Sequence, residues 1–110
     1  MTDKERVFGM IGLASRAGKI VSGSDAVNGQ LRAGNVKLLI ITKDISGNSL
    51  DKILRNIKGE EEIPCFSFGR SDELGDALGK PARTVAAITD KSFAEGISAI
   101  LEKINEEEDI

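Results

Sequence analysis

Leu38-Leu39-Ile40-Ile41 decides the fold, because this stretch is apolar at every position. A strand with one face in water alternates between apolar and polar residues, whereas a strand covered by helices on both faces is apolar throughout. The run therefore predicts the central strand of a sheet that lies between two layers of helices. Helices and strands that alternate around such a strand define an α/β fold.

Helix and strand signals alternate on both sides of this run. Thr2 and Glu5 have the spacing of a capping box, in which two side chains satisfy free backbone N–H groups at the start of a helix. Glycine follows several of the amphipathic stretches, and glycine is common just after the end of a helix. The first predicted elements are a helix at 3–16, a strand at 19–22, a helix that begins with a cap within 22–25 and ends at Gly34, and the strand at 38–41. They are followed by a helix that is capped by Asn48 and closed by Gly59, and by a strand at 63–67. The last elements are a helix at 71–78 with its cap within 71–73, a strand at 84–89, and a helix that opens at Asp90 and frays beyond Asn105.

This order of elements predicts a three-layer α/β/α sandwich with a central four-stranded mixed sheet. The chain has 110 residues, 40% of them apolar, which suits one domain but not two independent cores. We therefore expect one domain over residues 1–105 and an acidic tail at 106–110. The predicted core includes an apolar stripe on the third helix and the four phenylalanines: Leu50, Ile53, Leu54, Ile57, Phe8, Phe66, Phe68 and Phe93.

The cysteine and histidine content argues against an enzyme. Cys65 is the only cysteine, so no disulfide forms within the chain, and its apolar neighbours predict a small core residue. The chain has no histidine, the commonest general base and a favoured transition-metal ligand. Gly18 and Gly23 have the spacing of a phosphate loop, but Ser24 and Asp25 stand where that loop needs lysine and a hydroxyl residue. We expect no catalytic residue, no bound metal and no cofactor.

Charge is unevenly distributed along the sequence. The net charge is −3, yet residues 1–58 contain ten Lys/Arg against five Asp/Glu, and residues 59–110 contain five against thirteen. Seven of the acidic residues lie in two short clusters, at 60–62 and 106–109, which we expect to be solvated. An acidic protein can therefore still present a basic surface to nucleic acid, because the location of charge matters more than its total.

Two glycine-bearing segments combine cations with turns. In the first, residues 16–25, Arg16 and Lys19 precede a glycine-rich start of a helix, where exposed backbone N–H groups and the helix dipole attract phosphate. In the second, residues 79–83, two cations flank a proline, which fixes the local backbone and lowers the entropy lost when the loop is ordered. Each segment could also be an ordinary turn with surface charges, so the residues alone leave both interpretations open.

Three blocks of sequence carry a family resemblance through their order and spacing: residues 12–23, 37–42 and 78–83. Together they resemble the seven-Ae/thirty-e ribosomal protein family, and its bacterial YlxQ-type branch in particular, over residues 6–101. The resemblance implies a three-layer α/β/α sandwich and recognition of kink-turn RNA, a sharply bent helix with tandem sheared G·A pairs. It also implies that the start of the second helix and the loop at 80–83 lie on one surface.

The family pattern at the start of the second helix is only partly kept. Relatives place there a glycine, a small residue, an asparagine, a glutamate and, after two more residues, a lysine. The matching residues here are Gly23, Ser24, Asp25, Ala26 and Gly29. The remaining candidates are cations in the turns and polar residues one turn apart on the second helix. The candidate RNA-binding residues are Arg16, Lys19, Gly23, Ser24, Asp25, Asn28, Arg32, Lys80, Pro81 and Arg83.

The residues and the resemblance together predict a non-catalytic, cytoplasmic, ribosomal-type protein. We expect it to bind structured RNA, kink-turn-like or ribosomal, mainly through backbone contacts and shape. The alternative is a ribosome- or transcription-associated adaptor that contacts a ribosomal or transcription protein through its acidic second half. No apolar run approaches the length of a membrane span, so we expect no membrane contact. We expect a monomer.

Overall fold

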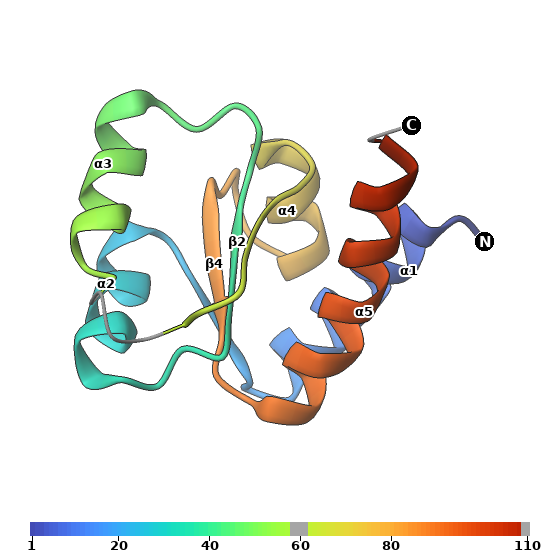
Figure 1. Ribbon diagram of the computed structural model, residues 1–110, viewed down its shortest axis with the longest axis horizontal. Helices are drawn as coiled ribbons and strands as arrows, with labels where there is room; N and C mark the ends of the chain where they lie inside the picture. The colour runs from blue at the N-terminus through green and yellow to red at the C-terminus, as the bar shows by residue number, and fades with distance from the viewer. Residues whose placement is uncertain (58–61, 109–110) are drawn as a thin grey trace.

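The structure is a computed structural model that describes residues 1–57 and 62–108. Helices and strands alternate along the chain, as the sequence predicts (Figure 1). The predicted helix end at Gly59 lies outside the described residues, as do Glu60, Glu61 and Asp109 of the acidic clusters. The elements are α1 (Asp3–Arg16), β1 (Ile20–Ser22), α2 (Ser24–Ala33), β2 (Leu38–Ile41), α3 (Gly47–Arg55), β3 (Cys65–Ser67), α4 (Ser71–Leu78), β4 (Val85–Ile88) and α5 (Lys91–Glu108).

The four strands form one mixed sheet in the order β1-β4-β2-β3. β4 pairs antiparallel with both of its neighbours, whereas β2 and β3 are parallel. Ile40 of β2 lies opposite Ala86 on one side and Phe66 on the other, which fixes the register. The apolar run at 38–41 is therefore an inner strand, buried at all four positions, as predicted. β1 and β3 form the two edges of the sheet.

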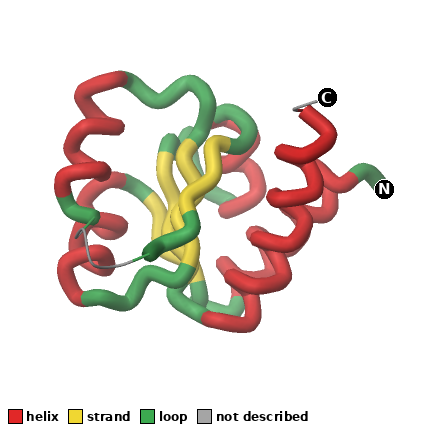
Figure 2. Tube along the Cα trace, in the orientation of Figure 1, coloured by secondary structure: helices red, strands yellow, loops and turns green. Residues whose placement is uncertain are grey.

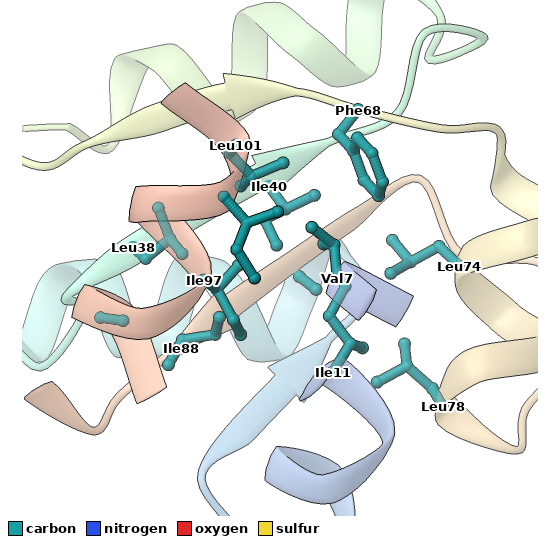
Figure 3. Packing of buried hydrophobic residues seen from close by; sticks show 13 residues of the cluster. Val7, Ile11, Leu38, Ile40, Phe68, Leu74, Leu78, Ile88, Ile97 and Leu101 are labelled. Carbon is teal, nitrogen blue, oxygen red and sulfur yellow. The ribbon is translucent and has the colours of Figure 1, made fainter. Parts of the chain in front are cut away.

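Helices cover both faces of this sheet, so the predicted sandwich is confirmed (Figure 2). α1, α4 and α5 lie on one face, and α2 and α3 lie on the other. Successive strand residues point to opposite faces, so Ile40 packs in the first core and Leu39 in the second. Full burial of each large apolar side chain stabilises the fold by about 1.5–3 kcal/mol. Figure 3 labels ten members of the first core: Val7, Ile11, Leu38, Ile40, Phe68, Leu74, Leu78, Ile88, Ile97 and Leu101.

The first and last helices begin as the sequence predicts. The Thr2 hydroxyl accepts a hydrogen bond from the backbone N–H of Glu5 at 3.1 Å, and the Glu5 carboxylate accepts one from the N–H of Thr2 at 3.2 Å. The capping box of α1 is thereby confirmed. The Asp90 carboxylate accepts a hydrogen bond from the N–H of Phe93 at 2.9 Å and so opens α5.

Two other predicted caps are wrong. Ser46, not Asn48, caps α3, because the Ser46 hydroxyl accepts a hydrogen bond from the N–H of Ser49 at 3.2 Å. Asn48 lies inside the first turn of the helix. α4 is capped one residue earlier than expected, at Arg70, whose backbone N–H donates to the Glu73 carboxylate at 3.0 Å.

Two predicted core residues are exposed. Cys65 lies on the edge strand β3, which has a neighbouring strand on one side only. Leu54 is 48% exposed, although the adjacent Ile53 is fully buried. α3 lies on the outside of the sandwich, and only part of its apolar stripe faces the core. Phe68 is buried, and the other three phenylalanines are partly buried against the first core, as expected.

The lengths of some elements differ from the prediction. β3 begins at Cys65 rather than at residue 63, and β4 is one residue shorter at each end. α5 continues to Glu108 instead of fraying beyond Asn105. The division between a domain at 1–105 and a tail at 106–110 stays a prediction. Among the described helices, none has both the length and the apolar character that a bilayer crossing requires.

Candidate nucleic-acid interface

α2 begins at a glycine whose backbone conformation excludes most other residues. Gly23 is the N-cap, with φ +88° and ψ 152°, and its N–H donates to the carbonyl of Val85 in β4 at 3.0 Å. No side chain caps the helix, although the sequence predicts one. Within the described part of the chain, the first-turn N–H groups of Ser24, Asp25 and Ala26 have no hydrogen-bond partner. Such N–H groups, together with the positive end of the helix dipole, favour an anion.

The loop between α4 and β4 is folded tightly against α4. The N–H of Lys80 donates to the carbonyl of Gly75 at 2.9 Å, and the N–H of Arg83 donates to the carbonyl of Ser71 at 3.1 Å. A side chain on Gly75 would overlap the carbonyl of Pro81, so only glycine lets the loop approach this closely. The loop therefore runs back along α4 toward the start of that helix, with Lys80 exposed and Arg83 partly buried.

The start of α2 and the end of this loop meet at one open hollow. The guanidinium of Arg83 is held by its own loop, because Nη1 donates to the carbonyls of Pro81 and Ala82 at 3.3 and 3.2 Å. Arg83 Nε lies 3.9 Å from the position that a Cβ on Gly23 would take. The structure thus brings together the two segments that the resemblance places on one surface. The hollow is lined by Ser22, Gly23, Ser24, Asp25, Ala26, Ala82, Arg83 and Thr84.

Arg16 lies near the other end of the same loop. A Cβ on Gly12 would lie 3.3 Å from the carbonyl of Ala77 and 3.6 Å from Arg16 Nη1. The Arg16 guanidinium therefore covers the junction between α1 and the last turn of α4, just before Gly79 and Lys80.

Lys19 lies apart from the start of α2. Its carbonyl accepts a hydrogen bond from the N–H of Thr89 at 3.0 Å, at the far end of the β1–β4 ladder. Four residues of extended chain separate Lys19 from Gly23, a distance of about 13 Å. Residues 16–25 therefore do not form one compact site, because the edge strand β1 separates their cations from the start of the helix.

Two further candidates lie along α2. Asn28 is partly buried, and its side-chain carbonyl oxygen has no hydrogen-bond partner among the described residues. Arg32 is exposed in the last turn, about 12 Å along the helix axis from Ser24. Neither residue lines the hollow, so Asn28 and Arg32 could contact only a ligand that extends along the helix.

Within residues 1–57 and 62–108, none of the five candidate cations forms an ion pair, whether or not it lines the hollow. Ion pairs occur elsewhere, for example between Lys4 and Glu73 at 2.8 Å and between Lys103 and Asp3 at 3.2 Å. Asp25 is the one acidic residue that lines the described hollow. The unpaired cations are Arg16, Lys19, Arg32, Lys80 and Arg83.

The sequence predictions miss several residues that shape this surface. Ala82 and Thr84 line the hollow, and Gly75 lets the loop pack on α4. A signal for Gly75 exists in the sequence, because glycine weakens the interior of a helix and needs a packing reason there. No comparable signal identifies Ala82 or Thr84.

The chemistry of the described residues does not resemble a catalytic centre. No three His, Cys, Asp or Glu side chains gather closely enough among them to hold a metal ion. Partial burial of the thiol raises the pKa of Cys65, although the residue as a whole is exposed. A raised pKa leaves less of the reactive thiolate at neutral pH.

The fold is that of a ribosomal-protein-like domain. The chain belongs to the Ribosomal protein L7Ae/L30e/S12e/Gadd45 family, whose sequence pattern matches residues 5–98. This result confirms the family predicted from the three sequence blocks. The family is non-catalytic.

Two bacterial relatives and two solved structures are similar to most of the chain. The RNA-binding protein YlxQ of Bacillus subtilis (strain 168) is 36% identical over 95 residues, which cover 86% of this chain and 94% of the relative. The RNA-binding protein YlxQ of Enterococcus faecium is 30% identical over 100 residues, which cover 91% of this chain and 95% of the relative. The solved structure of a Bacillus halodurans protein of unknown function has 29% identity and a TM-score of 0.79, and the match covers 87% of this chain and 96% of that protein. The Giardia lamblia 15.5kD RNA binding protein, at 17% identity and a TM-score of 0.72 over 96% and 90%, shares the fold.

Proposed function

We propose that this chain binds structured RNA through the surface formed by the start of α2 and the loop at 80–83. The observation that carries the proposal is the uncapped first turn of α2 beside the fixed guanidinium of Arg83. Backbone N–H groups and an arginine together suit a phosphate oxygen. The names of the two YlxQ relatives, both RNA-binding proteins, support RNA as the source of that phosphate.

We further propose that the RNA is sharply bent, as a kink-turn is. The hollow lies between the start of α2 and a loop that folds back on α4, and a bent backbone can contact both segments more closely than a straight one can. Asp25, Ala26 and Gly29 replace the polar residues that carry base recognition in the family pattern. Recognition should therefore rest mainly on phosphate positions and shape, and sequence should matter less.

The test is a titration of the full chain against a kink-turn RNA and a straight duplex at two salt concentrations. We expect tighter binding of the bent RNA, and affinity that falls as salt rises. K80A/R83A should weaken binding and reduce the salt slope by about one for each lost phosphate contact. K91A/K103A, which removes the same charge from α5, is the matched control and should bind like the unmodified chain.

The adaptor alternative makes the opposite prediction. Negligible binding of both RNAs at low salt, together with a stable complex with a ribosomal or transcription protein, would favour the adaptor. Equal loss of RNA affinity in K80A/R83A and K91A/K103A would instead show that overall charge matters and that the chosen surface is wrong.

A further inference from the structure

The outer face of α1 carries an apolar hollow that the fold leaves open. Leu13 is 53% exposed and Met1 is 96% exposed, whereas the inward residues Val7 and Ile11 are fully buried. All residues that line the hollow come from α1 or from the N-terminal residue. They are Met1, Arg6, Gly9, Met10, Leu13 and Arg16. Met10 is partly buried, and its methyl group packs toward Gly96 of α5, so the open part of the hollow lies over Gly9 and Leu13.

Gly9 lies in the middle of this face without a packing reason. A Cβ on Gly9 would have no atom within 4 Å, whereas one on Gly12 would meet the carbonyl of Ala77 at 3.3 Å. Glycine within a helix lowers stability relative to alanine. Gly12 is explained by the contact between α1 and α4, but Gly9 faces open space. A partner whose backbone approaches closely at Gly9 would give this residue the same role.

The charges around the hollow restrict the partner. Arg6 and Arg16 lie at its two ends, about 15 Å apart along the helix axis. Arg16 forms no ion pair with a described residue, and Arg6 reaches only the partly exposed carboxylate of Asp3, at 3.3 Å. A complementary surface therefore needs apolar side chains at its centre and carboxylates at both ends.

A second copy of this chain does not fit that description. If two α1 helices packed face to face in antiparallel orientation, Arg6 of each would approach Arg16 of the other. In parallel orientation, like arginines would meet. Either arrangement places like charges together at the ends of the contact, which is unfavourable. RNA fits less well than protein, because the exposed aliphatic side chain of Leu13 offers bases a poor stacking surface.

We propose that the outer face of α1 docks an acidic amphipathic helix of another protein. The partner places leucine-like side chains over Gly9 and Leu13, and carboxylates against Arg6 and Arg16. Helix-in-groove recognition of this kind uses apolar anchors at helical spacing. The docking face shares Arg16 with the candidate RNA-binding residues, so RNA that contacts Arg16 would compete with this partner.

The probe is a synthetic helical peptide with leucines at i, i+3 and i+7 and glutamates at both ends. Added to the full chain labelled with ¹⁵N, it should shift the backbone amide resonances of residues 9–13 in a saturable way. A peptide with lysine in place of each glutamate should leave them unchanged. L13D should lower the affinity for the acidic peptide at least about tenfold, since it removes the central apolar contact and adds a repelling charge. L54D, at an equally exposed leucine on α3, is the matched control and should bind normally.

Folding and binding can be separated with G9A. Alanine at this position should raise the melting temperature of the chain. It should nevertheless weaken binding of the acidic peptide, because its methyl group holds the partner backbone away. Equal binding of the acidic and lysine peptides, no shift in residues 9–13, or unchanged affinity in L13D would overturn the proposal. Shifts of the same amides by kink-turn RNA, abolished in L13D, would assign this face to RNA and would also overturn it.

Discussion

Gly75 and Pro81 touch backbone to backbone, so that the loop after α4 rests directly on the helix that precedes it. The carbonyl carbon of Pro81 would lie 2.8 Å from a Cβ on Gly75. The N–H of Lys80 also donates to the carbonyl of Gly75 at 2.9 Å, which ties the same two segments together. The position of the proposed RNA surface therefore depends on the absence of a side chain at residue 75.

The first prediction concerns that contact. G75A should destabilise the fold by about 1–3 kcal/mol, because the added methyl group forces the loop or α4 to move. It should also weaken RNA binding, since Lys80 and Arg83 move with the loop. Urea denaturation and RNA titration measure the two effects. G29A is the control, because a Cβ there has no atom within 4 Å, and it should not lower stability. Similar losses in both variants would disprove the packing role of Gly75.

A second prediction restores the family pattern on α2. The triple variant D25N/A26E/G29K should bind kink-turn RNA more tightly, with each restored polar contact worth about 1–3 kcal/mol. The open space around Gly29 leaves room for the lysine. The gain should be small on a straight duplex, which lacks the bent geometry. An equal gain in affinity for both RNAs would mean that the effect comes from the changed charge alone. In that case α2 would not distinguish a bent RNA from a straight one.

The third prediction tests the corrected cap of α3. S46A should lower the free energy of unfolding by about 1 kcal/mol, because the Ser49 N–H loses its acceptor. N48A should have little effect, since the Asn48 side chain caps nothing. Thermal denaturation of both variants decides between the two residues. A larger loss in N48A would reinstate the cap that the sequence suggests.

The fourth prediction concerns acid stability. The Asp44 carboxylate accepts hydrogen bonds from the hydroxyl and the N–H of Ser71 at 2.7 and 2.9 Å. These hydrogen bonds, the hydroxyl one above all, and one involving Thr42 lower the pKa of Asp44 from 3.8 to about 2. Asp44 therefore stabilises the fold fully above its unfolded pKa, and this stabilisation is lost as the pH falls from 3.8 through about 2.

Two other carboxyl groups act in the same direction. Lys4 lowers the pKa of Glu73, and Lys103 lowers that of Asp3, in each case mainly through a side-chain hydrogen bond. Urea denaturation from neutral pH down to about 2 should therefore show falling stability. D44N should be less stable at neutral pH and lose less on acidification. An identical pH profile for D44N and the unmodified chain would exclude Asp44 as a contributor.

Much of the fold is predictable because periodicity reports burial. The unbroken apolar run at 38–41 identifies an inner strand, and Thr2 with Glu5 identifies the start of α1. The wrong predictions arise where local sequence is ambiguous. Ser46 and Asn48 are both good capping residues, and only the backbone of the loop decides between them. Cys65 has apolar neighbours, but its strand lies at an edge of the sheet, and sequence periodicity does not reveal strand order.

The candidate site is predictable in its parts but not in its arrangement. The cations at 80–83 and the glycine-rich turn before α2 stand out in the sequence. Their proximity depends on the pairing of β1 with β4, which brings Gly23 beside Val85. The same pairing carries Lys19 to the opposite end of the edge strand. Strand pairing between residues far apart in the sequence is set by tertiary structure and cannot be read from local sequence. The family resemblance implied that the start of α2 and the loop at 80–83 share one surface, but it did not place Lys19.

Arg83 is oriented by its own loop before any ligand arrives, because the carbonyls of Pro81 and Ala82 hold its guanidinium. The rotational freedom of this side chain is therefore lost when the chain folds, and not when it meets its target. A receptor organised in advance associates with little rearrangement, so differences in affinity among RNAs should appear chiefly in how long each complex lasts.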